Sequence, residues 1–318
     1  MTVAFGHPLF YYPVGATSLG MNDADVLTVL DDPSGIFGPF KLANLADAHG
    51  TMIQDRHAGV LGIAGSLPPL TPVTSDFSNP DLNRSRIGET DVVDQEAVPY
   101  LAFYHVLANL DIVFDQFTEG TLRLHYTIEG TREDGTPWSV EQSSMTHSRY
   151  GAQYGSFVLL RALDLLEYNK FEEIEFTSIH TDGFITEEDL ESQIVGVLSS
   201  SSLQKGLRQR SVIRARAGST IHVRILLRPA EGGDDQAVDL ALRVPRGAKG
   251  KSSVQFRGGK PPRRLDRDQF SSFEEILDTL NSGEHSYELI VDGLGGYRTL
   301  PQDFIVKGRE GLTVQVVG

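Results

Sequence analysis

His7 is the residue whose setting most strongly suggests chemistry, because it stands between a glycine and a proline in the sequence Ala-Phe-Gly-His-Pro. Glycine permits unusual backbone angles, and proline fixes φ. A strand-to-turn corner built in this way can aim an imidazole into a cleft as a general base. His7 is therefore the candidate catalytic residue, and the competing interpretation is a turn histidine with no chemical role.

Two Asp-x-His pairs follow, Asp47 with His49 and Asp55 with His57. Imidazole and carboxylate together can bind a metal, but this spacing matches no recognised metal motif. Asp55 and Arg56 can instead form a structural ion pair. The chain has no cysteine, which excludes thiolate ligands and cysteine nucleophiles. We therefore predict neither a metal site nor a cofactor.

A serine nucleophile needs an activating base and backbone amides that stabilise the oxyanion. The chain holds no Gly-x-Ser-x-Gly sequence, and Ser66, which follows Gly65, is the nearest formal candidate. An ordinary turn serine is the favoured interpretation. The glycine-rich segment 59–66 lacks the Gly-Lys-Ser/Thr of a phosphate loop and predicts tight hairpin packing.

The composition predicts folded domains with an acidic surface. At 318 residues the chain has room for two or three domains, and 40% of its residues are hydrophobic. It contains 43 acidic and 28 basic residues, and the formal charge of −15 disfavours nucleic acid as a partner. A basic run at 257–264 could bind an acidic partner, although a solvated loop is the favoured interpretation. No apolar run approaches the roughly 20 residues that span a bilayer, and we see no export signal.

The hydrophobic patterns predict a mainly β chain with a few helices, of the α+β class. Short apolar runs between turns indicate a partial small β-barrel over 1–75, followed by a linker or long loop at 76–98. In 99–170 we expect a helix from Pro99, a hairpin of strands 122–129 and 138–143, and a helix at about 154–168. His105 is expected in the core and His125 on the solvent side of its strand.

Residues 171–318 are predicted to form a separate β-rich unit. Alternating apolar residues mark strands at 220–227 and 238–244, which resemble part of an immunoglobulin-like sandwich. His222 is expected on a polar strand face. A helix begins at Ser272, whose hydroxyl can cap the Glu275 amide, and strands at 287–291 and 312–316 close the chain. The serine run 199–202 is expected in a loop.

Several spaced motifs in the first quarter of the chain resemble the later part of the SpoIVB-type serine peptidase domain. They are the segments 4–8, 40–43, 50–62 and 72–73, in that order. The chain is similar here to long bacterial envelope proteins in which a Gly-Met-Ser-Gly-Ser-Pro serine motif precedes the Gly-His motif. The resemblance implies that His7 is a peptidase general base and that the full-length protein is extracytoplasmic. The serine motif does not occur in this chain, so no nucleophile or catalytic acid is assigned.

Two main hypotheses about function follow. In the first, the chain is part of a serine endopeptidase, a hydrolase of protein or peptide substrates. It is then inactive alone, because an upstream N-terminal half supplies the serine. In the second, it is a non-catalytic envelope protein, binding or structural, whose β-domains bind another protein or a polysaccharide. A metal-dependent hydrolase using His49 and His57 is a third alternative.

Overall fold

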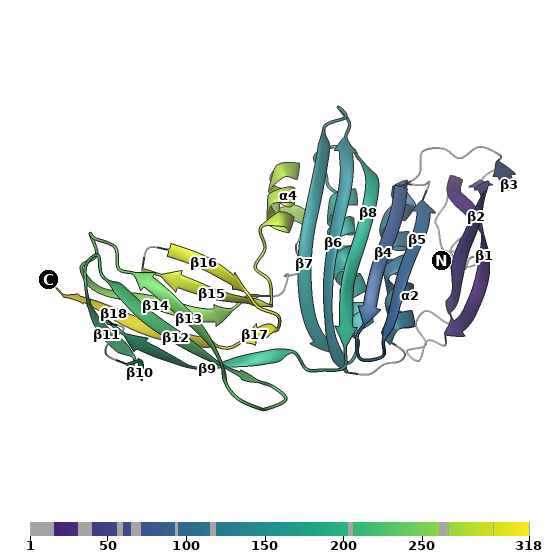
Figure 1. Ribbon diagram of the computed structural model, residues 1–318. Helices are drawn as coiled ribbons and strands as arrows, with labels where there is room; N and C mark the ends of the chain where they lie inside the picture. Colours follow the sequence, from purple (N-terminus) through teal and green to yellow (C-terminus); the bar gives the residue numbers. More distant parts are fainter. Residues whose placement is uncertain are drawn as a thin grey trace. The chain divides into compact units, whose positions relative to one another are not determined.

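The computed structural model describes residues 16–30, 40–55, 60–64, 71–92, 95–114, 119–202, 206–260, 265, 267–294 and 296–317; up to residue 64, and at 152–154, it describes the backbone alone. The chain divides into two compact units, which we describe separately (Figure 1). Unit 1 comprises residues 1–143, 148–187 and 264–283, and unit 2 comprises 144–147, 188–263 and 284–318. Each unit is therefore assembled from segments that are far apart in the sequence.

Unit 1 is built on an eight-stranded sheet with the strand order β3-β2-β1-β5-β4-β8-β6-β7. An antiparallel ribbon at one edge consists of β1 (Ala16–Leu30), β2 (Phe40–Asp55) and β3 (Val60–Ala64). Two hairpins follow, β4 (Thr71–Asn79) with β5 (Arg84–Val92) and β6 (Gly120–Arg132) with β7 (Pro137–Ser148). Between them lies β8 (Ile174–Thr186), parallel to β4 and antiparallel to β6.

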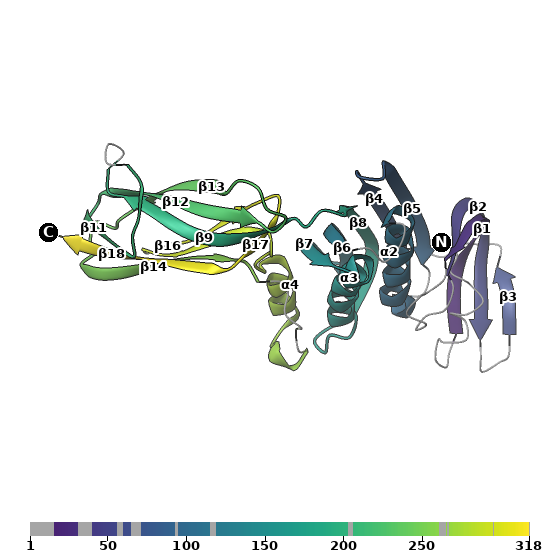
Figure 2. The same cartoon turned by 90° about the horizontal axis from the view of Figure 1, so that it is seen from below.

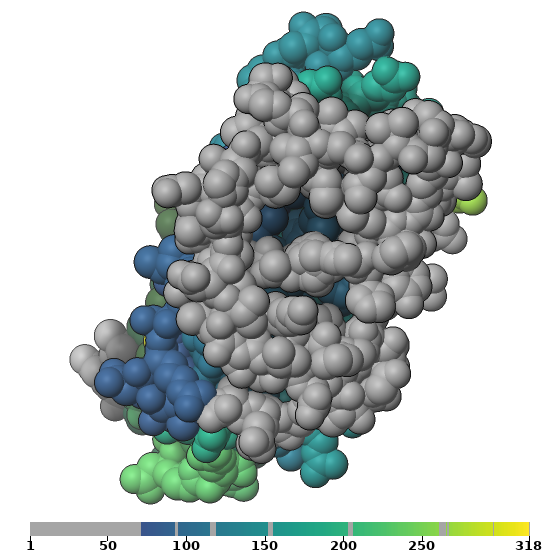
Figure 3. Space-filling view, turned by 90° about the vertical axis from the view of Figure 1, so that its right-hand side faces the viewer, coloured from purple at the N-terminus to yellow at the C-terminus, as the bar shows by residue number. Residues whose placement is uncertain are grey.

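The turn between β4 and β5 is fixed by asparagines. The Asn79 side-chain oxygen accepts hydrogen bonds from the amides of Asp81 and Leu82 at 3.0 and 3.1 Å. Asn83 has φ 50°, a left-handed conformation that asparagine tolerates better than most residues. The turn is exposed, and atoms of the blue segment that includes this hairpin reach the surface in Figure 3. Residues 76–98 were predicted as a linker or long loop; of these, 76–92 form strand and turn, and 95–98 are helical. The polar residues belong to the turn and to the solvent side of β5.

Each hairpin is followed by a helix, and both helices cover the same face of the sheet (Figure 2). α2 (Val98–Phe114) packs on β4 and β5, whereas α3 (Gly151–Glu167) packs on β6 and against α2. Leu122 and Leu124 of β6 are buried on this face and contribute to the unit 1 core. Gly155 permits the close approach of α3, because a Cβ at that position would lie 2.3 Å from Leu122 Cδ2.

The helical stretch 95–114, which includes α2, is long and apolar enough by composition to span a membrane. It is the one such stretch among the residues that the structure describes, and 78% of its most apolar window is buried within the molecule. A helix that is apolar around most of its circumference is expected where it packs on several sides. The packing of α2 on β4, β5 and α3 accounts for its composition.

α4 (Phe273–Asn281) belongs to unit 1 although it follows most of unit 2 in the sequence. The Phe273 ring meets Trp138 of β7 edge-on, with the centroids 5.8 Å apart. As predicted, Ser272 caps the helix, and its hydroxyl accepts a hydrogen bond from the Glu275 amide at 3.2 Å. The residues of α4 buried in the unit 1 core are Phe273, Ile276 and Leu280.

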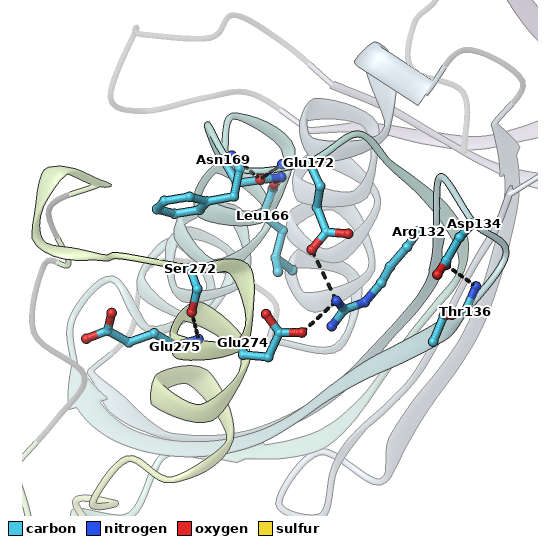
Figure 4. Close-up of polar contacts among 10 residues, drawn as sticks. Arg132, Asp134, Thr136, Leu166, Asn169, Glu172, Ser272, Glu274 and Glu275 are labelled. Atoms are coloured by element: carbon cyan, nitrogen blue, oxygen red, sulfur yellow. Dashed lines mark hydrogen bonds and ion pairs between the residues drawn. The ribbon is translucent and has the colours of Figure 1, made fainter.

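An arginine at the end of β6 holds α4 against the rest of unit 1 (Figure 4). Arg132 donates hydrogen bonds to Glu172 at 3.2 Å and to Glu274 at 2.6 Å, and its guanidinium lies 5.2 Å from the centroid of the Phe273 ring. The hydrogen bond from Arg132 lowers the pKa of Glu274 below its ordinary value. The contact thus joins a strand, the segment after α3 and a helix about 140 residues further along the chain.

Unit 2 is a sandwich of two sheets around a second apolar core. One sheet has the order β10-β9-β12-β13, with β17 paired to β9; its strands are β9 (Glu191–Ser200), β10 (Arg208–Gln209), β12 (Thr220–Pro229), β13 (Gln236–Arg243) and β17 (Ile305–Lys307). The other has the order β11-β18-β14-β15-β16, with β11 (Val212–Arg216), β14 (Gly250–Gly258), β15 (Glu288–Gly293), β16 (Gly296–Pro301) and β18 (Arg309–Val317).

The mainly β, α+β class predicted from the sequence is confirmed. None of the sheets formed by the described residues closes into a barrel, so the strands expected in a partial barrel lie instead at the open edge of the unit 1 sheet. The boundary expected at residue 171 is displaced, because β8 lies inside the unit 1 sheet and α4 packs in the unit 1 core. Ser199 and Ser200, expected in a loop, are buried residues at the end of β9.

Candidate functional site

The residues that the sequence singled out for chemistry are not brought together in the part of the chain that the structure describes. His7, His57 and Ser66 lie outside the described residues. His49 and Asp55 lie in β2, of which the backbone alone is described. The role of His7 as a general base therefore stays a prediction.

A serine–histidine pair does occur in unit 1, between β4 and α2. His105 Nε2 lies 3.0 Å from Ser75 Oγ, and His105 Nδ1 lies 3.0 Å from Thr90 Oγ1 of β5. The exposed fractions of His105 and Ser75 are 0% and 1%. Burial lowers the pKa of His105 to about 3, and the nearby positive charge of Arg86 acts in the same direction. The ring is therefore neutral at physiological pH.

This buried pair does not have the properties of a catalytic dyad. A nucleophile and its base must reach the substrate, and these two side chains are closed off from solvent. A general base also works best when its pKa lies near the operating pH, several units above that of His105. Both ring nitrogens have hydroxyl partners, so the polar group is satisfied where it is buried. The prediction that His105 is a core histidine is confirmed.

The opposite face of the unit 1 sheet carries a row of imidazole and carboxylate groups. His125 of β6 stands opposite Asp182 of β8 in the ladder, with Nδ1 2.8 Å from Asp182 Oδ1. Its Nε2 lies 3.3 Å from Glu141 Oε1 of β7. His180 Nε2 lies 3.7 Å from the same Asp182 oxygen, and its Nδ1 lies 2.9 Å from Thr74 Oγ1 of β4. His125 thus lies on the solvent side, as predicted, although it is 30% exposed and paired.

Thr74, His180 and Asp182 follow the hydroxyl–imidazole–carboxylate order of a nucleophilic triad, but two features argue against catalysis. The 3.7 Å separation of His180 and Asp182 exceeds hydrogen-bond distance. The strands also lie inside the sheet, so their amides are used by the ladder and supply no oxyanion hole. Within the described residues, no group of three or more His, Asp or Glu side chains could hold a metal ion. The row can form hydrogen bonds and ionic contacts with a partner.

The two units differ strongly in charge. The segments of unit 1 contain 31 acidic and 11 basic residues, whereas those of unit 2 contain 12 acidic and 17 basic residues. The net charges are therefore −20 and +5, which together give the −15 of the chain. The stretches 192–230 and 240–265 contain no Asp or Glu. Unit 2 therefore carries a net positive charge, although the chain as a whole is acidic.

Exposed cations lie near the C-terminal end of β18, which Figure 1 shows beside β11 and β14. Arg214 of β11 and Lys251 of β14 both stand opposite Gln315 of β18, one on each side of it. Residues directly opposite one another in a ladder share a face, and strands are about 4.8 Å apart. The α-carbons of Arg214 and Lys251 are therefore roughly 10 Å apart on one face of the sheet.

The turn between β11 and β12 brings further cations to this end. Its residues Gly218 and Ser219 form backbone hydrogen bonds with Val244, at 3.0 and 2.9 Å. A Cβ at Gly218 would lie 3.4 Å from Cγ of Arg246, so the stem of that arginine passes over the turn. We call the resulting group the basic strip; it consists of Arg214, Arg216, Arg243, Arg246 and Lys251.

The side chains of the basic strip are exposed, and within the described residues none of them forms an ion pair. The arginines of β12 differ in this respect. Arg224 binds Asp239 through two hydrogen bonds of 2.7 Å, and Arg228 binds Asp235 through two of 2.9 and 3.2 Å. An unpaired cluster of cations keeps its charge available for an external anion, whereas the β12 pairs are already neutralised.

No family model, no curated protein and no solved structure matches this chain. The resemblance to SpoIVB-type peptidases therefore stays a hypothesis.

The basic strip was not predicted from the sequence. The cations considered there were those of the run 257–264, and charge was counted over the whole chain, which is acidic. Arg257, which opens that run, is paired with Glu284 through two hydrogen bonds. A better signal was present in the two long stretches without an acidic residue. Which of their cations share a surface follows from the register of β11, β14 and β18, and local sequence does not encode that register.

Proposed function

We propose that this chain is a non-catalytic binding protein that holds an acidic polypeptide on the basic strip of unit 2. The single observation that carries the proposal is the gathering of five unpaired, exposed cations at one end of the sandwich. Charges farther apart than about 8 Å are largely screened at physiological salt. A bound partner would therefore respond to the local strip more than to the charge of −15 on the chain.

An acidic polypeptide fits this surface better than a nucleic acid does. Single-stranded nucleic acids are bound by cations interleaved with aromatic side chains on which the bases stack. The strip consists of Arg and Lys only, and Tyr297, an exposed aromatic residue of unit 2, lies in β16 at the far edge of the sheet.

The proposal is tested with fluorescent poly-L-glutamate and the full chain at pH 7.5 and about 50 mM salt. Binding should be measurable by anisotropy and should weaken as salt is raised. The variant Arg214→Gln/Arg216→Gln/Lys251→Gln should bind about tenfold more weakly, since three exposed charges contribute roughly 0.5 kcal/mol each.

The matched control is Arg224→Gln/Asp239→Asn/Arg228→Gln/Asp235→Asn, which removes both charges of each β12 pair and leaves the net charge unchanged. Its affinity for poly-L-glutamate should stay close to that of the unmodified chain. Equal losses in both variants, or no binding by the unmodified chain, would remove the basis of the proposal. Tighter binding of a DNA duplex of matched charge would replace the acidic polypeptide with nucleic acid.

We also retain, as a separate proposal, that the chain is the later part of a SpoIVB-type serine endopeptidase. It has the support of the spaced motifs in segments 4–8, 40–43, 50–62 and 72–73. This proposal expects no peptidase turnover by the chain alone, and activity dependent on His7 once an upstream segment with the serine motif is joined to it. Fluorophosphonate labelling of Ser66 in the chain alone, with cleavage lost in Ser66→Ala, would contradict it.

A further inference from the structure

We propose that the acidic polypeptide binds as an additional strand on β11, extended along the free edge of the second sheet of unit 2. The inference rests on the proposed function, because it specifies how the basic strip would hold its partner. It concerns backbone pairing as well as charge, and the two contributions can be measured separately.

The position of β11 in the sheet provides the pairing edge. β11 is five residues long and ends the strand order; among the residues that the structure describes, its one neighbour is β18, paired in parallel. A strand directs alternate backbone groups to each side, so an edge strand leaves about half of its N–H and C=O groups without a ladder partner. Extended peptides bind proteins by completing such edges with main-chain hydrogen bonds.

β11 differs in charge from the other edges of unit 2 with comparable length. β13 carries Asp239 and Arg243, which have opposite charges, and β16 carries one cation, Arg298, before it ends at Pro301. β11 carries Arg214 and Arg216 and has no acidic residue. It is therefore the edge at which an acidic segment gains from both backbone pairing and charge.

The side-chain alternation of β11 defines the composition of its partner. Arg214 and Arg216 are exposed on the outer face, whereas Ile213 and Ala215 are buried on the inner face, at 1% and 4% exposure. An added strand presents every second residue to each face. Acidic residues should therefore alternate with residues that favour strands, such as threonine or valine, beside the edge of the core.

Basic residues on an edge strand also have a protective role, since they discourage edge-to-edge aggregation. That role requires charge alone and predicts no difference between two acidic peptides of equal charge. Strand addition requires backbone amides in the peptide, so it predicts a large difference. The comparison of two such peptides decides between the two roles.

The experiment uses two fluorescein-labelled peptides, (Glu-Thr)5 and (Glu-Pro)5, with the full chain at low salt. They carry the same charge, but proline removes every second backbone N–H and fixes φ near −65°, away from the roughly −120° to −140° of a β-strand. The Thr peptide should bind at least about tenfold more tightly, because loss of a few backbone hydrogen bonds is enough for that factor. Saturation with the Thr peptide should also slow amide hydrogen exchange within residues 212–216.

The outcomes separate this inference from the proposed function. Equal affinities of the two peptides, both lost in Arg214→Gln/Arg216→Gln/Lys251→Gln, would overturn strand addition and leave the basic strip as an electrostatic site. Failure of both peptides and of poly-L-glutamate to bind would overturn both proposals. Tight binding of the Thr peptide with exchange slowed at β13 or β16 instead of β11 would also refute the assignment.

Discussion

Protonation of His105 should destabilise unit 1 as the pH falls below neutrality. The ring is 0% exposed, and burial lowers its pKa to about 3 from an ordinary value of 6.5. In the unfolded chain the same imidazole becomes protonated near pH 6.5. Because the unfolded state then binds one more proton than the folded state, acid favours unfolding. The stability from the neutral ring is complete above about pH 6.5 and is lost progressively toward pH 3.

The magnitude follows from the two pKa values. Between them, the difference in bound protons approaches one, and the free energy of unfolding changes by about 1.4 kcal/mol per pH unit. Integrated from pH 7 to pH 5, the loss is about 2 kcal/mol. A typical domain is stable by 5 to 15 kcal/mol, so this effect is large enough to measure.

Urea unfolding, monitored by tryptophan fluorescence, measures the stability of unit 1 at each pH. Trp138 is the one tryptophan of the chain and lies in the unit 1 core, 5% exposed. The variant His105→Gln should be less stable at pH 7, but between pH 7 and pH 5 it should lose about 2 kcal/mol less than the unmodified protein. His222→Gln, a change at a partly buried histidine of unit 2, should leave the pH dependence of this signal unchanged.

Equal pH dependence of stability in the unmodified protein and in His105→Gln would show that His105 does not cause the effect. An independent measurement avoids the variant altogether. In proton NMR of the unmodified protein, the ring of His105 should show no titration between pH 8 and pH 5. A midpoint near 6.5 would mean that the ring is solvated.

Three further predictions concern local contacts. Gly130→Ala should lower the free energy of unfolding of unit 1 by about 2 to 3 kcal/mol, measured by urea unfolding. The new Cβ would lie 2.2 Å from Trp138 Cζ2 and 2.3 Å from the Glu175 carbonyl oxygen. Gly247→Ala is the control, because a Cβ there meets nothing within 4 Å. Ser272→Ala should lower the free energy of unfolding by about 1 kcal/mol, because α4 loses its cap. Ser272→Asp should keep most of this stabilisation, since aspartate also caps helices. Equal stabilities of the two variants would contradict the capping role. Hydrogen bonds from Arg257 hold the pKa of Glu284 at about 2, below its ordinary 4.5, so this carboxylate stabilises unit 2 fully above about pH 4.5 and loses its effect as the pH falls toward 2. Amide exchange of β14 should show a loss on the order of 2 kcal/mol over that range, absent in Glu284→Gln.

Elements with strong local signals were predictable from the sequence. The helix that begins near Pro99 is α2, and the turn at 133–136 joins β6 and β7 as expected. The Ser272 cap was predictable because a capping hydrogen bond spans three residues. β12 and β13 alternate in burial as their sequences do, with Ile225 opposite Val238. In each case the determining contacts lie close together in the chain.

The elements that were missed depend on distant partners. β4 has serine and asparagine on its buried face, and this pattern fits a strand only because His105 of α2 satisfies Ser75. The parallel pairing of β4 with β8 joins Val73 to Ile179 across more than a hundred residues. The periodicity of α4 revealed its apolar face but not the core that receives it. The basic strip depends likewise on the register of three strands.

The discontinuous build of unit 1 has a consequence for its synthesis. The core of unit 1 is complete only when α4 has left the ribosome, and residues 188–263, which belong to unit 2, are made first. At about 5 to 20 residues per second, that intervening segment takes on the order of 4 to 15 s to translate. During this interval the nascent sheet lacks Phe273 and exposes apolar surface around Trp138. A chaperone that binds nascent chains would have its longest opportunity at this stage, and truncation before residue 273 should yield an aggregation-prone product.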